Sequence, residues 1–257
     1  MYSTKGINKE INLKTIDDLN FPKDCKINFD LKLVDLFKEM SKNKVPVKEL
    51  LKSEYFKIKE DIGHKPMLMD IFSESNYPVK MYLQTFGSWL NFKDEIDELD
   101  DIEKEWTKNI IGEFLKEIEK TSMTKSYKIP VLLSFVKDGF FKPVVRVDDV
   151  IHYFKSFYLK NKRYLIDIQD KGNKDWQKWN FDKLKKFVLA NPLHFLSSGQ
   201  SRKYFDLNTE KGIFSLNKDI IDYIEKNPEK KEHLKKCFTD RVQYRLKNYF
   251  KRKYLED

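Results

Sequence analysis

Glycine, proline and cysteine are scarce in this chain of 257 residues, which contains eight, eight and two of them, respectively. Sandwiches, barrels and glycine-rich nucleotide folds use glycine and proline in their turns, so this scarcity disfavours them and favours helices. Cys25 and Cys237 lie far apart and suggest no disulfide framework, which fits a reducing compartment. The N-terminal stretch lacks the apolar segment of an export signal, so we expect a cytoplasmic protein.

Long hydrophobic runs are missing as well. Charged residues make up 35% of the chain and the mean hydropathy is −0.67, which excludes an integral membrane protein. Aromatic residues make up 14%, enough to supply large buried surfaces, and this excludes a disordered chain. The length allows one large domain or two modest ones, each with a core that needs no disulfide or metal.

Motifs for catalysis and cofactor binding are also lacking. No glycine pair has the spacing of a phosphate-binding P-loop, and we find no nucleophile elbow. We treat the histidines as isolated from one another and from both cysteines, so we expect no metal, no cofactor and no small-molecule substrate. These histidines are His64, His152, His194 and His233.

One weak imitation of a nuclease site remains, formed by Asp24, Asp30 and Lys32. Such a site holds Mg²⁺ between strands, whereas Asp30 begins a helical pattern and fits the role of an N-cap better. We therefore expect no intrinsic enzymatic activity, and any ATPase or nuclease activity would belong to a partner or to another part of a longer chain.

Apolar residues recur at the spacing of amphipathic helices over most of the sequence. The predicted helices cover 30–40, 46–63, 66–73, 78–86, 89–96, 102–120, 130–137, 148–159, 181–188, 217–227 and 228–253. Phe205 and Leu207, followed by an Asn-Thr-Glu-Lys-Gly turn and Ile213, indicate a β-hairpin. Three helices followed by a hairpin is the order of a winged helix-turn-helix, although hairpins also occur as plain surface decoration.

We therefore predict a mainly α, two-lobed protein with a small β-hairpin. A polar N-terminal arm covers 1–28, and a helical module with a Phe-Gly-Ser-Trp segment covers 29–121. A winged-helix-like module covers 122–216, and C-terminal basic helices cover 217–257.

The charge balance of 50 basic and 41 acidic residues gives a net charge of +9, which attracts polyanions such as nucleic acid. The lysine excess is equally explained by codon bias in an AT-rich genome.

Residues 91–105 carry eight acids and two lysines, so this stretch should not face nucleic acid. Residues 155–186 carry ten basic and four acidic residues, interleaved with Tyr164, Trp176 and Trp179. This second stretch can track a phosphate backbone and stack bases, or it can be a solvated face over half-buried tryptophans.

Lys125 to Lys128 directly precede a predicted helix, where free N–H groups receive phosphate, or where a capping segment with an aromatic anchor would lie. The residues predicted to hold phosphates are Lys125, Tyr127, Lys128, Lys183, Lys185, Lys186, Arg202, Lys203, Arg241, Arg245 and Arg252. In an alternative, the protein is an adaptor without DNA contact, in which Phe86, Trp89 and Trp106 dock a helicase or nuclease and the acidic stretch sets the orientation.

Two segments carry a family resemblance. EDIGHKPMLMDIFSE with YPVKMYLQTFGSWLNFKDEIDEL resembles the helical module with Gly-Arg-Arg-Pro-Thr-Arg and Phe-Gly-Ser-Trp motifs of DNA-associated bacterial proteins. MTKSYKIPVLLSF resembles the block that follows it. With FDLKLVDLFKEM and RVQYRLKNYFKRK, the order is similar to the C-terminal accessory region of bacterial superfamily 2 DEAD/DEAH-type helicases. Some of these carry a phospholipase D-like nuclease domain and belong to restriction or phage-defence systems.

The resemblance covers the chain from about residue 27 onward and implies a non-catalytic DNA-binding accessory module without the motor. It is either part of a longer chain or a relative that works beside a motor in trans. Where the pattern has Arg-Arg-Pro-Thr-Arg, this chain has His64, Lys65, Pro66, Met67 and Leu68. Apolar residues thus replace some of the expected cations, so we expect the first module to pack against a protein.

Overall fold

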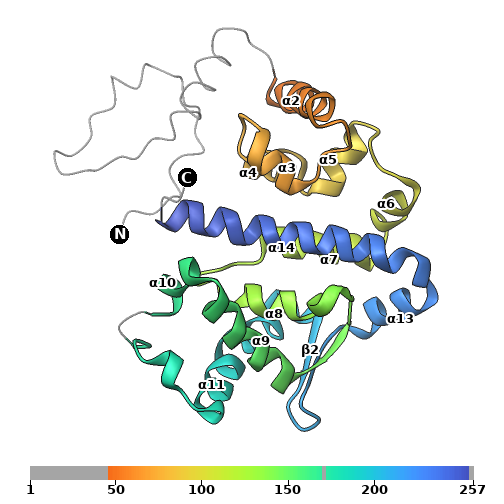
Figure 1. The fold of residues 1–257 in the computed structure, drawn as a ribbon. Coiled ribbons are helices and arrows are strands. Elements are labelled where there is room, and N and C mark those ends of the chain that lie inside the picture. Colours follow the sequence, from red (N-terminus) through yellow and green to blue (C-terminus); the bar gives the residue numbers. More distant parts are fainter. Residues whose placement is uncertain (1–45, 170–171, 255–257) are drawn as a thin grey trace, which may run out of the picture.

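The computed structural model describes residues 46–169 and 172–254, and within them the chain is mainly helical with a small antiparallel sheet, as predicted (Figure 1). The α-helices are α2 (Val47–Ile62), α3 (Leu68–Glu74), α4 (Val79–Phe86), α5 (Trp89–Glu95), α6 (Asp101–Trp106), α7 (Ile110–Lys120), α8 (Lys128–Ser134), α9 (Val147–Lys160), α10 (Leu165–Ile168), α11 (Phe181–Val188), α12 (His194–Leu196), α13 (Lys218–Lys226) and α14 (Lys231–Tyr254). The strands are β1 (Val144–Arg146), β2 (Phe205–Asn208) and β3 (Ile213–Leu216). The predicted arm 1–28, the helix expected at 30–40 and the set Asp24, Asp30 and Lys32 lie outside the described residues.

Helices α2 to α5 form the first lobe. Helix α2 begins after Pro46 and ends at Gly63, whose φ of 73° is the left-handed conformation that glycine adopts without strain. The four helices enclose a small aromatic core, in which the rings of Tyr82 and Phe92 are 5.0 Å apart and edge-on. The second lobe has its own, larger cluster of buried residues.

The helix expected at 102–120 is divided in two, so that prediction is wrong. Helix α6 ends at Trp106, and Asn109 caps the start of α7, where its side chain accepts a hydrogen bond from Ile111 N. A Cβ on Gly112 would lie 2.2 Å from the carbonyl oxygen of Trp106, so the two helices meet where only glycine fits. The apolar residues still recur about every four positions from α6 into α7, because both helices bury the same side of the chain.

The second lobe contains the predicted hairpin. Strands β2 and β3 pair with Leu207 opposite Phe214, and β1 adds a third strand that the sequence analysis missed. The strand order is β1-β3-β2, all antiparallel. Helix α8 precedes β1, and α9 and α11 lie between β1 and the hairpin.

Helix α14 lies between the two lobes, side by side with α7, with α2 to α5 on one side and α8 to α11 and the hairpin on the other (Figure 1). Its stripe of apolar residues is buried in the large cluster, as predicted, while Tyr244 on another side belongs to the small cluster. The buried apolar residues of α2 to α5 belong to the small cluster and those from α6 onward to the large one, with Leu90 and Tyr244 as the exceptions. The predicted boundary near residue 121 falls between α7 and α8, which share the large cluster.

Buried polar contacts join the first lobe to α14. The carboxylate of Asp240 accepts hydrogen bonds from the backbone N–H groups of Leu68 and Met69, at the start of α3, at 3.1 and 3.0 Å. Leu68 itself is fully buried. The segment where apolar residues replace the cations of the family pattern therefore packs against α14 of the same chain.

Candidate nucleic-acid interface

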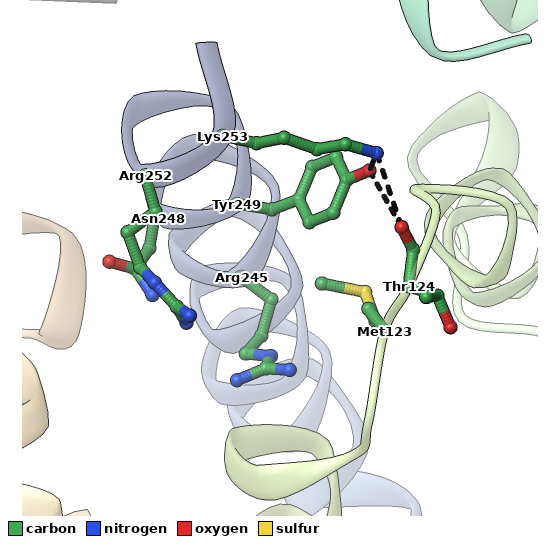
Figure 2. Close-up of a pocket in the computed structure, with 7 residues that line it drawn as sticks. All are labelled: Met123, Thr124, Arg245, Asn248, Tyr249, Arg252 and Lys253. Atoms are coloured by element: carbon green, nitrogen blue, oxygen red, sulfur yellow. Dashed lines mark hydrogen bonds between the residues drawn. The ribbon is translucent and has the colours of Figure 1, made fainter. Parts of the chain in front are cut away.

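The predicted phosphate-binding residues lie in three separate groups, and one of them forms a pocket. Arg245 and Arg252, together with Lys253, line a pocket of about 340 Å³ between the C-terminal part of α14 and residues 123–124 (Figure 2). Arg245, Asn248, Tyr249 and Arg252 are spaced by three or four residues and therefore share one face of the helix. We call this the basic pocket. None of the residues that line it carries a carboxylate. The lining residues are Met123, Thr124, Arg245, Asn248, Tyr249, Arg252 and Lys253.

Arg245 forms the floor of the basic pocket. Its guanidinium donates hydrogen bonds to the backbone oxygens of Glu119, at 3.1 Å, and Thr121. Its Nε is buried and has no hydrogen-bond partner in the described part of the chain. Burial lowers the pKa of Arg245, and so does the positive charge of Arg252, whereas Tyr244 has the opposite effect. Two guanidinium groups thus lie close together at a site whose lining contains no carboxylate, an arrangement that favours a bound anion.

Lys253 stands at the opposite wall and is fixed by buried Asp167. Its Nζ lies 2.9 Å from Asp167 Oδ1. It also lies 3.2 Å from the carbonyl oxygen of Thr124, a contact that Figure 2 shows. Tyr249 and Tyr254 also donate their hydroxyl protons to Asp167 Oδ1, at 2.6 and 2.9 Å. Burial alone would raise the pKa of Asp167, but hydrogen bonds from Ser126 N, Tyr249 and Lys253 outweigh it and lower the pKa.

The helix start at residues 125–128 meets an anion from its own chain. Ser126 N donates a hydrogen bond to the Asp167 carboxylate, and Lys125 Nζ lies 3.9 Å from Asp167 Oδ1 and 3.0 Å from its backbone oxygen. Tyr127 is 9% exposed and packs edge-on against Phe187. The prediction that Tyr127 holds a phosphate is therefore wrong, because its ring is part of the core and an internal carboxylate occupies the expected anion position.

Lys128 lies on the other side of the same segment and lines a second pocket, of about 690 Å³, together with Lys116 and Lys120. Its Nζ donates a hydrogen bond to Thr121 Oγ1 at 3.1 Å. Burial lowers the pKa of Lys128, Glu117 raises it, and the charge of Arg245 lowers it further. Lys128 and the basic pocket are therefore electrostatically coupled through Arg245.

The second group is on α11, where the three lysines differ in environment. Lys183 Nζ lies over the ring of Trp179 at 4.5 Å, Lys185 forms an ion pair with Asp148 at 2.9 Å, and Lys186 is exposed. The rings expected to stack bases are buried, because Trp176 is 0%, Tyr164 6% and Trp179 9% exposed. The prediction of base stacking in residues 155–186 is therefore wrong, while most of the described cations of this stretch are exposed.

The third group precedes β2. Arg202 and Lys203 are both exposed, and Lys203 forms an ion pair with Glu113 of α7. Its hydrogen bond with Glu113 raises the pKa of Lys203. Of the two, only Arg202 is without an ion pair among the described residues.

Arg241 is buried, so the prediction that it binds phosphate is wrong. It is 1% exposed, and its Nε donates a hydrogen bond to Glu119 Oε1 at 2.8 Å. The other oxygen of Glu119 accepts a hydrogen bond from Trp89 N, at the start of α5, at 3.1 Å. The side chain thus links α14, α7 and α5 inside the protein.

Two of the three aromatic residues predicted to dock a partner are also core residues. Trp89 is 3% and Trp106 0% exposed, and Trp106 Nε1 donates a hydrogen bond to the Tyr223 hydroxyl at 2.8 Å. Neither is accessible for docking, so the prediction is wrong for both. Phe86 is half-buried, with Lys48 Nζ 5.4 Å from its ring centre.

The acidic stretch 91–105 is neutralised within the chain. Glu98 pairs with Lys59 at 2.7 Å, Glu105 pairs with Lys230 at 2.6 Å, and Lys93 forms a buried ion pair with Glu103. Glu95 faces Lys48 and Lys52 in the same way. Several acids of this stretch are therefore paired with cations of the same chain, some on the first lobe and one, Lys230, just before α14.

The net charge is divided unevenly along the chain. Residues 46–120 contain 11 basic and 17 acidic residues, a balance of −6, whereas residues 121–216 contain 18 basic and nine acidic residues, a balance of +9. Most described cations of 121–216 have no carboxylate within 4.0 Å. The exceptions are Lys125, Lys178, Lys185 and Lys203. The surplus positive charge of the protein therefore resides in the second lobe.

Among the described residues, no helix combines the length and the apolar character needed to cross a membrane. Comparison of the chain with protein-family models, with curated proteins and with solved structures finds no match. The chemistry of the site therefore has to be argued from its own residues. The basic pocket supplies the guanidinium donors of Arg245 and Arg252 and the amide of Asn248, which suit a phosphate group, while the Lys253 ammonium and the Tyr249 hydroxyl contact Asp167.

Proposed function

We propose that this chain is a non-catalytic nucleic-acid-binding accessory module that holds the phosphate backbone through the basic pocket and the cationic second lobe. The observation that carries the proposal is the convergence of Arg245, Arg252 and Lys253 on one pocket without a lining carboxylate. Lys253 is already paired with Asp167, whereas the Arg245 and Arg252 guanidinium groups repel each other until an anion neutralises them. A cytoplasmic helicase-type motor of a restriction or phage-defence system, as its partner, is proposed from the sequence resemblance alone.

The topology of the second lobe supports the same proposal. Helix α8, strand β1, helices α9 and α11 and the β2-β3 hairpin follow the order of a winged helix-turn-helix, with the short helix α10 inserted between α9 and α11 and α12 between α11 and the hairpin. Strand β1 completes the sheet beside β3. In helix-turn-helix proteins the last helix of the motif enters the major groove. We propose α11 for this role, because it is the longer of the two helices before the hairpin and presents Lys183 and Lys186 to solvent.

The test is a pair of charge reversals on α14, measured by fluorescence anisotropy with labelled duplex and single-stranded DNA at low salt. Arg252→Glu removes a pocket cation, while Lys247→Glu makes the same charge change at an exposed residue that does not line the pocket. Both variants lower the net charge equally, so their difference isolates the pocket. We expect Arg252→Glu to weaken binding by at least about tenfold, or ~1.4 kcal/mol, and Lys247→Glu to have a much smaller effect.

Equal effects of the two variants would contradict a role for the basic pocket. If wild-type protein bound neither DNA at low salt, the nucleic-acid proposal would be wrong and the adaptor without DNA contact would replace it. Circular dichroism of each variant confirms that the fold is retained, which is expected because both side chains are exposed.

A further inference from the structure

We infer that Cys237, His233 and Glu103 form a binding site for a transition-metal ion, with the ligand chemistry of Zn²⁺. The potential ligand atoms of these three residues all lie within 4.8 Å of one another. An ion about 2.0 to 2.3 Å from each ligand atom requires the side chains to converge by roughly 1 Å. The site lies where α6 packs against the first turns of α14, away from the basic pocket and independent of the proposed function.

The helix geometry explains why the ligands converge. His233 and Cys237 are four residues apart on α14 and therefore share one face of the helix. Glu103 is buried on α6, where it is 4% exposed. The sequence analysis treated His233 as isolated from both cysteines, which overlooked this spacing, and Glu103 is too distant in the sequence to be associated with either residue. The expectation of no metal is therefore replaced by a candidate site.

Two carboxylate oxygen atoms that accept no hydrogen bond from the described residues face the histidine. Glu103 Oε2 accepts hydrogen bonds from Lys93 and from Asp100 N, which leaves Oε1, 4.0 Å from His233 Nε2. Asp100 Oδ2 lies 3.4 Å from the same nitrogen but outside the set of ligand atoms within 4.8 Å of one another, so it would have to move closer to serve as a fourth ligand. His233 Nε2 is buried and has no hydrogen-bond partner among the described residues. A metal ion would satisfy all three atoms at once.

The ligand set identifies the class of ion. One thiolate with one imidazole and carboxylate oxygens suits Zn²⁺, whereas Mg²⁺ and Ca²⁺ prefer oxygen ligands alone. The charges also balance. The Cys237 thiolate and the carboxylates of Glu103 and Asp100 are negative, the Lys93 ammonium is positive, and the resulting charge of −2 matches a divalent cation. Lys93 and Asp100 N hold the Glu103 carboxylate in place, as outer contacts do in metal sites. His233 also lines a surface pocket of about 630 Å³, which provides an entry path.

The experiment uses Co²⁺ as a spectroscopic probe, titrated into the reduced full chain. We expect one equivalent to bind with a thiolate-to-cobalt charge-transfer band and the visible bands of a tetrahedral site, and Zn²⁺ to displace it. Binding releases the proton of the thiol. Zn²⁺, and not Mg²⁺, should raise the melting temperature, because the ion binds only the folded chain.

The variants assign the ligands. Cys237→Ser should abolish the charge-transfer band, while Cys25→Ser, which changes the other thiol of the chain, should retain it. His233→Gln should abolish the stabilisation by Zn²⁺, and it changes a side chain that is 29% exposed and tolerates replacement better than the buried cysteine. No band in the wild type, or a band that persists in Cys237→Ser, would overturn the proposal. Stabilisation by Zn²⁺ that survives in His233→Gln would do the same.

Discussion

Arg241 and Arg252 lie on the same helix and have opposite roles, which are decided by burial. The sequence pattern of α14 predicts one apolar stripe and assigns every arginine to the remaining surface. The helix instead lies between two lobes, so Arg241 faces buried Glu119 while Arg252 reaches solvent and the basic pocket. The spacing of residues in the sequence located the cations of α14. It could not show that both lobes cover this helix, because the first lobe is distant from α14 in the sequence.

Arg241→Ala should strongly destabilise the fold. The substitution leaves the fully buried carboxylate of Glu119 without its ion-pair partner, which costs about 3 to 5 kcal/mol. The free energy of unfolding from urea titration measures the loss, and Arg252→Ala serves as a control with an expected change below about 0.5 kcal/mol. Equal unfolding midpoints for the two variants would show that the buried pair contributes nothing.

Asp167 should make stability depend on pH in the acid range. Its folded-state pKa is lowered relative to the unfolded chain, so the carboxylate stabilises the fold above the unfolded value of about 3.9. This contribution is lost as the pH falls through the lower folded-state value. Asp167→Asn should therefore be less stable than wild type at neutral pH, by an amount that shrinks below about pH 4. Urea unfolding across this range tests it, and a difference that stays constant with pH would contradict it.

At the scale of elements, local patterns predicted most helices and the hairpin, and long-range packing decided the rest. The periodicity across 102–120 concealed the corner between α6 and α7, because both helices bury the same side of the chain. Strand β1 has only three residues and exists because it pairs with β3, about 70 residues later in the sequence. The helix expected to stop before Pro192 continues instead through a wide turn at Leu189–Leu193 into α12.

Gly112→Ala tests the corner between α6 and α7. In an ordinary helix interior, alanine stabilises relative to glycine by about 0.5 to 1 kcal/mol. Here the new Cβ would lie 2.2 Å from the carbonyl oxygen of Trp106, so the helices must separate. We expect the variant to be destabilised by about 1 to 3 kcal/mol, measured as a lower melting temperature. The exposed Lys116→Ala on the same helix should be nearly neutral, and a stabilised Gly112→Ala would show that the corner is not tight.

At the scale of the whole molecule, the net charge differs between the two parts of the chain. It is −6 over residues 46–120 and +9 over residues 121–216. The residues predicted to hold phosphates do not meet on one surface. Only some of them come together, in the basic pocket, while α11 and the segment before β2 carry separate groups. The ion pairs that neutralise Glu98 and Glu105 join residues 39 and 125 positions apart, so the sequence could not assign them.

The salt dependence of DNA binding tests the central claim most directly. Each phosphate neutralised by a cation adds about 0.9 to the slope of log affinity against log salt for duplex DNA. We predict a steep negative slope for the wild type, a slope shallower by about one unit for Arg252→Ala, and an unchanged slope for Lys247→Ala. A flat salt response of the wild type, or identical slopes for all three proteins, would contradict the account.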